Sequence, residues 1–392
     1  LFSFLRELVK KGFAITVGAV CLGYLALEWY NGRAQMADFR VYYDATNALL
    51  HGDTLYGKAF GVSSGFYKYS PFACLPFIPL AMMPYTLASV LYYLLITATI
   101  IFFSLRIAGY VQQLSRSEFS LRLPILAGIF LIDHLERELH LGNINLFLLV
   151  LLFEAYKALK SNNGIKGGVL YGIVLLLKPH FLLLLPYLLW KKQFRASIFS
   201  LGIVVLGILL PALAIGWNQN IHLVRQWLTA MSDHNMALQL SPNTIYGLIN
   251  RIFLDSQAGS WLVWGVLAVV AAAFIGFMFR NDTANKLRWS NEIRFTEFFL
   301  LVGLVPNLVH TDTEHFMWVW PMLALAIQQA LNIDSPRRNV QIALLMIAFI
   351  PFAINTPDIV GERVRLLFDE GGLGIANLII LLVGGMVIGD RC

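Results

Sequence analysis

The chain has 392 residues and a formal net charge of +6, and 58% of its residues are hydrophobic while only 13% are charged. Soluble proteins carry about twice that charged fraction, so the composition excludes an ordinary soluble domain. With no basic stripe beside aromatic residues in the sequence, nucleic acid is not an expected partner. The apolar residues instead form blocks of about 15 to 22 residues, the length at which a helix crosses a membrane.

These blocks predict an all-α fold, a polytopic membrane bundle of about 10–12 transmembrane helices. Several blocks are short, which is typical of broken or re-entrant helices. The first block, residues 13–29, is longer than a signal-peptide core and is not followed by an A-x-A cleavage site, so we expect it to be a membrane helix. The candidate spans are residues 12–29, 85–106, 121–133, 143–158, 166–178, 180–190, 196–216, 258–279, 296–309, 316–331, 339–355 and 372–389.

Internal repeats and low-complexity linkers are absent from the sequence, which favours a single domain over residues 1–392. Cys21, Cys74 and Cys392 are far apart and lack ligand spacing, so neither disulfides nor a metal site is expected, and no cofactor is predicted. Between Pro71 and Pro84 four prolines break regular helix. We expect a short half-helix there, ahead of the span at 85.

The distribution of lysine and arginine predicts the orientation of the chain in the membrane, because these residues are enriched in cytoplasmic loops. With residues 1–11 in the cytoplasm, most of the 29 lysines and arginines fall on the cytoplasmic side. Both termini are then cytoplasmic, and the first loop, residues 30–84, lies outside. All eight histidines fall on this outer side, beginning with His51. Any chemistry is therefore predicted to face the periplasm or exterior, as in an integral protein of a bacterial inner (plasma) membrane.

The outer loop contains "DFRVYYDATNALLHG", which predicts a helix with Asp38 as its N-cap and Gly52 just beyond its end. On a structural interpretation Asp38 only caps the helix, Arg40 lies at the surface, and rings such as Tyr42 line the membrane interface. On a functional interpretation Asp38 is the general base that accepts a proton from an acceptor hydroxyl. Asp44 lies roughly 120° away around the helix axis and is the weaker candidate.

A polar segment, "IDHLERELHLGNIN" (132–145), is predicted to be a short outer turn between two spans. Its charged residues either form a site or only solvate a loop; they are His134, Glu136, Arg137 and His140. Gly142 permits close approach of the backbone. Asn143 and Asn145 then enter an apolar helix, where their amides need partners.

Lys178 is a single lysine inside the apolar stretch "VLLLKPHFLLLLP". An ionisable residue at that depth indicates function, and an ammonium suits an anionic phosphate, although lysines near helix ends also snorkel to the interface. Pro179 breaks the helix beside it, and His180 follows at the outer tip.

Two later outer segments carry further polar residues. "HTDTEHFMWVW" offers His310, Asp312, Glu314 and His315, whose spacing is not a standard zinc-ligand spacing. We expect these residues to contact substrate hydroxyl or phosphate groups rather than metal. The long loop 217–253 is amphipathic, so it either lies on the outer leaflet or covers a cleft.

Four segments in this order resemble glycosyltransferase family 87: "ADFRVYYDATNALLHGDTLY", "FYKYSPFACLPFIPLAMMP", "LHLGNINLFLLVLLF" and "GGVLYGIVLLLKPHFLLLLPYLLWKKQFR". The family includes polyprenyl-phosphate-mannose-dependent mannosyltransferases of the GT-C architecture. In that architecture the first outer loop carries a catalytic aspartate and a cavity opens at the outer membrane face.

The resemblance assigns roles to particular residues. The family's catalytic aspartate falls on Asp38, and its lysine–proline motif falls on Lys178. The glycine–glutamine-x-asparagine motif falls on residues 142–145, with Asn143 in place of the glutamine. A late tryptophan- and histidine-rich motif falls on His315, Trp318 and Pro321. The remaining candidates for substrate or donor binding are Arg40, Tyr42, Asp44, His140, Asn145, His180 and His310.

The resemblance therefore implies a membrane glycosyltransferase, surrounded by membrane lipids, that takes a hexose from a polyprenyl-phosphate-linked sugar and transfers it to a glycolipid or glycan acceptor. Mannose is the expected hexose. The resemblance also implies that the configuration of the anomeric carbon is inverted. Two alternatives stay open. A transporter or flippase of lipid-linked sugars also uses broken helices and intramembrane charges, but it tends to show internal repeats. A scaffold subunit would not require polar residues gathered on one side.

Overall fold

The computed structural model describes residues 2–61, 65–236, 241–252, 291–309, 312–333, 335–355 and 357–389, with the single positions 265, 269 and 276. The predicted span 258–279 and His310 lie outside the described residues, apart from those single positions. The chain packs as two compact units. Unit 1 combines Leu1–Phe103 with Leu135–His234, and unit 2 combines Ser104–His134 with Asn235–Cys392. The single domain expected from the sequence stays a prediction.

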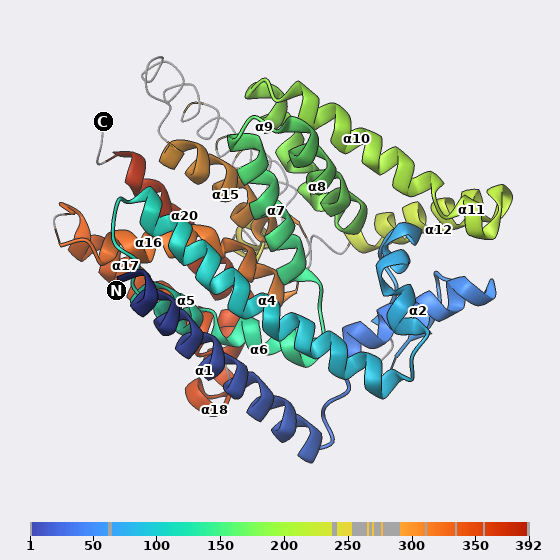
Figure 1. The fold of residues 1–392 in the computed structure, drawn as a ribbon, viewed down its shortest axis with the longest axis horizontal. Coiled ribbons are helices and arrows are strands. Elements are labelled where there is room, and N and C mark those ends of the chain that lie inside the picture. The colour runs from blue at the N-terminus through green and yellow to red at the C-terminus, as the bar shows by residue number, and fades with distance from the viewer. Residues whose placement is uncertain are drawn as a thin grey trace. The chain divides into compact units, whose positions relative to one another are not determined.

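Unit 1 is almost entirely helical (Figure 1). Three helices of the described residues continue from one unit into the other, namely α4, α6 and α12. The helices of unit 1 are α1 (Phe2–Tyr30), α2 (Ala37–His51), η1 (Pro71–Phe77), α3 (Ile78–Ala81), α4 (Tyr85–Leu114), α6 (Ile132–Leu141), α7 (Asn145–Lys160), α8 (Gly164–Leu177), η2 (Pro179–Leu183), α9 (Leu184–Trp190), α10 (Phe194–Leu209), α11 (Ala212–Ile215) and α12 (Trp217–Met236).

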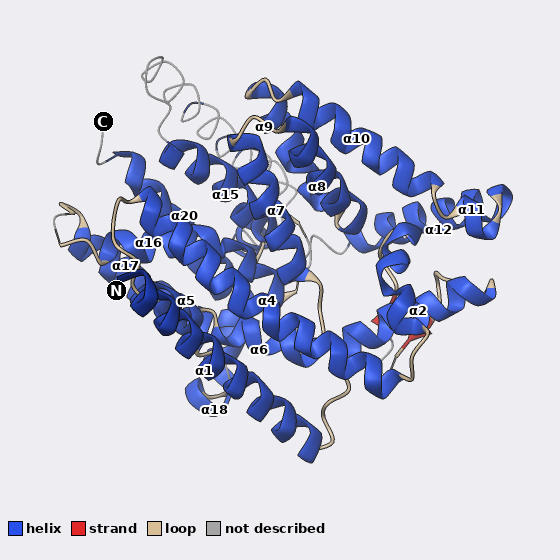
Figure 2. Ribbon diagram, viewed as in Figure 1, coloured by secondary structure: helices blue, strands red, loops and turns tan. Residues whose placement is uncertain are grey.

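Extended structure in the described residues is limited to one short hairpin, which follows α2 in unit 1 (Figure 2). Its strands β1 (Ala59–Phe60) and β2 (Gly65–Phe66) are antiparallel, with Ala59 opposite Phe66. Unit 2 is helical, with helices α5 (Arg122–Phe130), α13 (Ile245–Ile252), α15 (Asn291–Leu308), η4 (Thr313–Val319), α16 (Trp320–Ala330), α17 (Arg338–Ala353), α18 (Pro357–Val360), α19 (Glu362–Leu367), η5 (Phe368–Gly372) and α20 (Leu373–Gly389).

The fold class predicted from the apolar blocks is confirmed. Three helical stretches in the described residues are long and apolar enough to cross a membrane: Arg6–Tyr30, Tyr85–Leu114 and Glu362–Met386. Large apolar side chains stay exposed on these and neighbouring helices, for example Ile15 and Leu206, as lipid contact requires. The protein is an all-α polytopic membrane protein. Each predicted span that falls on described residues is helical, as one helix, as a 3₁₀–α pair or, over 121–133 and 196–216, as parts of two successive α-helices.

Some local predictions are wrong. The segment 132–145 is not a turn, because α6 occupies its first ten residues. An acidic residue in the first turn of α6 and a histidine in its last turn suit the helix dipole. The long loop 217–253 likewise contains the helices α12 and α13. The proline-rich half-helix ahead of the span at 85 is confirmed as η1 and α3.

Helix α2 begins two residues earlier than predicted. Met36, not Asp38, occupies the N-cap position, and Asp38 lies in the first turn. At the other end Gly52 is confirmed just beyond the helix, in the left-handed conformation with φ 73°. Asp38 therefore lies in the first turn of α2 and is hydrogen-bonded to a residue in a distant part of the sequence.

Close packing of α8 on α10 sets the position of the α8 C-terminus, which is followed by Lys178 (Figure 1). Gly168 and Gly172 lie four residues apart on the contact face, in a small-xxx-small pattern. A Cβ at Gly168 would lie 2.4 Å from the Ala196 carbonyl oxygen, and one at Gly172 would lie 2.7 Å from Ile203 Cβ. Only glycine therefore permits this approach.

Candidate functional site

A hydrogen bond joins the predicted base to the segment between α6 and α7. Asn143 Nδ2 donates to Asp38 Oδ2 at 2.6 Å, although the two residues are 105 positions apart in the sequence. Asp38 is half-buried and Asn143 is buried. The shorter asparagine, in place of the glutamine of the family motif, is thus long enough to reach the carboxylate.

The oxygen of the Asn143 amide is also hydrogen-bonded, and this fixes the orientation of the amide. Asn143 Oδ1 accepts from the Tyr42 hydroxyl at 3.2 Å and from the Ile144 backbone N–H at 2.8 Å. The Tyr42 and Tyr69 hydroxyls are 3.0 Å apart. Because Tyr42 has one O–H and gives it to Asn143, Tyr69 is the donor in that pair. Burial, with Tyr69 close by, raises the pKa of Tyr42 well above its ordinary value, so Tyr42 stays a neutral donor.

A second chain of contacts holds Lys178. Its Nζ donates to Asn145 Oδ1 at 3.0 Å, and Asn145 Nδ2 donates to Glu138 Oε2 at 3.2 Å. Lys178 is 7% exposed, while Glu138 and Asn145 are fully buried. Lys178 Nζ also lies 5.9 Å from the centre of the Tyr69 ring, in cation–π range. Tyr69 therefore links the Lys178 contacts to the Asp38 contacts.

Both chains of contacts start from one break in the helical structure. Helices α6 and α7 meet at 115°, and residues 142–144 form the break between them. Asn143 lies in the break and Asn145 is the first residue of α7, so one short segment presents an amide to Asp38 and another to Lys178. Non-helical backbone of this kind is tolerated in membrane proteins where neighbouring groups form hydrogen bonds with its N–H and C=O groups.

Gly142 is required at this break for two reasons. Its φ is +68°, in the left-handed region that favours glycine. A Cβ at this position would also lie 2.7 Å from Phe39 Cβ and 2.7 Å from Met36 Cε, both at the start of α2. The absent side chain lets the segment lie directly against the turn that carries Asp38.

We expect Gly142→Ala to lower the midpoint of thermal unfolding in detergent, because the left-handed conformation alone costs about 1–2 kcal/mol for an L-residue. The contact with Phe39 Cβ adds to this cost, since that atom cannot move without its backbone. Gly23→Ala in α1 is the matched control: no atom lies within 4 Å of its Cβ position, and alanine favours helix. An unchanged midpoint for Gly142→Ala would contradict the packing described here.

The loop before η1 is attached to the same region. Ser70 Oγ donates to the Leu176 carbonyl at 2.6 Å, in the last turn of α8. The Tyr56 hydroxyl donates to the Tyr69 carbonyl, also at 2.6 Å. These bonds hold Tyr69 in place beside Lys178.

Four other candidate residues of unit 1 pair elsewhere. Arg40 Nε donates to Asp44 Oδ2 at 2.8 Å, and the Arg40 guanidinium lies 4.1 Å from the centre of the Tyr85 ring. His140 Nδ1 lies 2.6 Å from Oε2 of Glu28, a buried carboxylate at the end of α1. Glu136 and Tyr24 are also hydrogen-bonded. His180 is half-buried in the first turn of η2.

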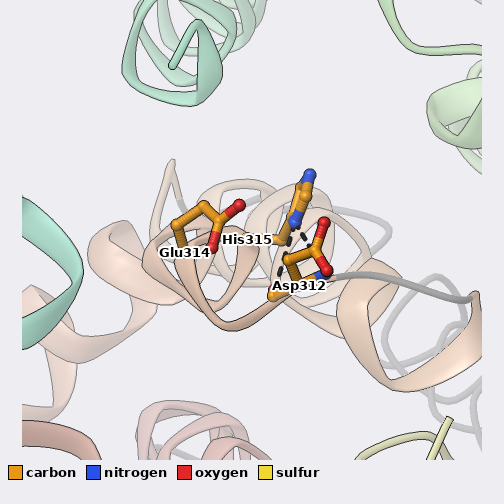
Figure 3. Close-up of side chains that lie close together, drawn as sticks. All are labelled: Asp312, Glu314 and His315. Atoms are coloured by element: carbon orange, nitrogen blue, oxygen red, sulfur yellow. Dashed lines mark hydrogen bonds between the residues drawn. The ribbon is translucent and has the colours of Figure 1, made fainter. Parts of the chain in front are cut away.

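In unit 2, Asp312, Glu314 and His315 lie close together at the start of η4 (Figure 3). Their ligand atoms are within 4.8 Å of one another. Asp312 and His315 form a capping box, in which His315 Nδ1 accepts from the Asp312 backbone N–H at 3.1 Å. His315 also packs edge-on against Trp318. The geometry of Asp312 and His315 is therefore accounted for by helix capping.

Two residues of the site were missed by sequence reasoning. Glu138 is one of several charges in the segment 132–145, and Tyr69 is one of several rings in "FYKYS". A signal for Glu138 exists: His134, Glu138 and Gly142 are spaced four apart, and all three are buried. Recognising α6 as a helix would have placed Glu138 on its buried face.

Comparison with known proteins identifies the family of the chain. The model of glycosyltransferase family 87 matches residues 66–302, more than half of the chain. The chain belongs to glycosyltransferase family 87. An Alpha-(1->3)-arabinofuranosyltransferase of Corynebacterium glutamicum is 29% identical over 187 residues, which are 46% of this chain and 42% of that relative. The aligned region thus spans less than half of the relative's length. No solved structure matches the chain.

The region matched to family 87 contains Glu138, Asn143, Asn145 and Lys178 but not Asp38. The hydrogen bond from Asn143 joins Asp38 to a residue of the matched region.

Proposed function

We propose that the protein is a membrane glycosyltransferase that transfers a sugar from a polyprenyl-phosphate-linked donor to a hydroxyl of a lipid or glycan acceptor. The observation that carries the proposal is the pair of contacts made by the segment 142–145, which holds a carboxylate through Asn143 and an ammonium through Asn145. The carboxylate suits the removal of a proton from a hydroxyl, and the ammonium suits the binding of a phosphate.

In the proposed reaction Asp38 accepts the proton of the acceptor hydroxyl. The acceptor oxygen forms a bond to the anomeric carbon as the bond from that carbon to the phosphate oxygen breaks, and the lipid phosphate leaves with the electron pair. Lys178 stabilises the negative charge that develops on the departing phosphate, because fixed charges in a buried site act more strongly than in water. Attack opposite the leaving group inverts the anomeric centre.

The roles of the side chains follow from their contacts. Asn143 holds Asp38 by one oxygen, and Tyr42 holds Asn143, so the carboxylate does not rotate freely. The remaining predicted donor-binding residues, among them Arg40, His180 and His315, keep their proposed role in contacting sugar or phosphate.

The sugar has two candidates. Mannose is proposed from the resemblance to the mannosyltransferases of the family. Arabinofuranose is the second candidate, since the relative with 29% identity carries the name of an arabinofuranosyltransferase. The proposed site faces the extracytoplasmic side of a bacterial plasma membrane, which the distribution of lysine and arginine supports.

The test uses purified protein in lipid nanodiscs with synthetic polyprenyl-phosphate-mannose or polyprenyl-phosphate-arabinofuranose and a panel of lipid and glycan acceptors. We expect one donor to be consumed and its sugar to appear on an acceptor. Donor binding without turnover for both sugars would contradict the proposal and favour a transporter or flippase of lipid-linked sugars. Family membership favours the transferase over that alternative.

A further inference from the structure

Glu138 is a buried carboxylate that neither the sequence motifs nor the proposed chemistry uses. It is 0% exposed and lies in the last turn of α6, four residues before the break at Gly142. An ionised carboxylate at such a position is costly unless hydrogen bonds compensate for the lost water. Its contacts therefore indicate what it does.

Both oxygens of the Glu138 carboxylate contact the start of α7. Oε1 accepts from the Leu146 backbone N–H at 2.8 Å, and Oε2 accepts from Asn145 Nδ2 at 3.2 Å. An anion at a helix N-terminus is favoured by the unpaired N–H groups and by the helix dipole. The carboxylate thus holds the first turn of α7 in place.

The contact with Asn145 also decides which way that amide points. An ionised carboxylate only accepts hydrogen bonds, so it selects the NH₂ group of Asn145. The amide oxygen of Asn145 must then face the other way, where it accepts from Lys178 Nζ at 3.0 Å. Reversing the amide would place an NH₂ group against an ammonium, two donors with no acceptor between them.

Glu138 is connected to the Asp38 side of the site as well. Its backbone carbonyl accepts from the N–H groups of Gly142, at 3.0 Å, and Asn143, at 3.2 Å. Asn143 in turn donates to Asp38. The backbone of this one residue therefore contacts the beginning of the break between α6 and α7, and its side chain contacts the first two residues of α7.

We propose that Glu138 is a positioning residue: its carboxylate orients the Asn145 amide and thereby sets the place and charge environment of the Lys178 ammonium that receives the donor's phosphate. The last clause rests on the proposed function. The link from Glu138 through Asn145 to Lys178 rests on the contacts alone.

Glu138→Gln is the first variant. Glutamine keeps the shape and can still accept the Leu146 N–H, but its second atom is an NH₂ group that opposes the NH₂ of Asn145. We expect the KM for the donor to rise about tenfold or more, with a smaller change in kcat, since a hydrogen bond to a charged group is being disturbed. Affinity for undecaprenyl phosphate alone, a probe that needs no turnover, should fall by a similar factor.

The decisive variant exchanges the acid and the amide, as Glu138→Gln combined with Asn145→Asp. The new glutamine accepts from Leu146 N–H and donates to the new carboxylate, which accepts from Lys178. We expect the double variant to recover most of the lost affinity for the phosphate. A purely structural role in capping α7 predicts no recovery from the second substitution. Glu154→Gln is the matched control, because Glu154 pairs with Lys157 on the half-exposed face of α7.

Each outcome decides the proposal. Unchanged donor KM and unchanged phosphate affinity in Glu138→Gln would overturn it, and so would a double variant no better than the single one. If Glu138→Gln does not fold, Asn145→Leu breaks the same link while leaving Glu138 on the Leu146 N–H, and unchanged phosphate affinity there would refute the inference. A wild-type protein that binds the phosphate but transfers no sugar would contradict the proposed function alone.

Discussion

Asp38→Asn is expected to reduce sugar transfer by about 10²- to 10⁴-fold, the range that a general base contributes. Asparagine has the same shape as aspartate but does not accept a proton at neutral pH. In the variant the amide introduced at position 38 faces the NH₂ group of Asn143. That introduced amide can rotate so that its oxygen accepts the hydrogen bond, and we therefore expect the variant to fold. Initial rates with the active donor and acceptor, together with the thermal midpoint, check both expectations.

Two further variants separate the role of Asp38 from a general effect of charge. Asp53→Asn removes an exposed carboxylate just beyond α2 and should leave the rate of transfer unchanged. Asp44→Asn breaks the ion pair with Arg40 in the same helix as Asp38. Transfer that persists in Asp38→Asn but disappears in Asp44→Asn would move the base to Asp44.

Lys178→Met is the second variant with a large expected effect. Methionine keeps the length of the side chain and removes the charge, so the phosphate loses a charge-assisted partner worth about 1.5–3 kcal/mol, or roughly 10- to 100-fold in affinity. We expect the donor KM and the dissociation constant for undecaprenyl phosphate to rise together. Isothermal titration with the phosphate in nanodiscs measures this without turnover.

The controls for Lys178 test charge and position. Lys166→Met removes an exposed lysine from the first turn of α8 and should leave phosphate affinity unchanged. Lys178→Arg keeps a cation but presents a fork that is too wide for the single Asn145 oxygen, so we expect partial affinity. If Lys178→Met bound the phosphate as tightly as wild type, the phosphate would be held elsewhere.

The largest difference between expectation and structure lies in the segment 132–145. Its high density of charges made a solvated turn the natural interpretation, but α6 forms there and buries His134 and Glu138 on one face. Polar residues are read as surface residues because burying them is costly. That cost is offset here by partners that are distant in sequence or hidden in the next helix, which no local pattern reveals.

Asp38 shows the same limit at the other end of the site. Its position before a helical pattern predicted an N-cap, yet the helix begins at Ala37 and Asp38 accepts from Asn143 instead. Capping preferences are local and are worth about 1 kcal/mol. A tertiary hydrogen bond to a charged group in a half-buried site contributes a free energy of at least that size, so it can override a capping preference.

The sequence by itself determined the membrane class, the placement of most helices and the break at Pro179, because apolar block length and the conformational limits of proline are properties of short segments. It also indicated Asp38, Asn143, Asn145 and Lys178 as the residues to examine. The tertiary structure alone decided that Asn143 meets Asp38, that Asn145 meets Lys178 and that Glu138 orients Asn145. Such pairings depend on how helices cross and pack, and side-chain contacts between distant segments leave no periodic trace in the sequence.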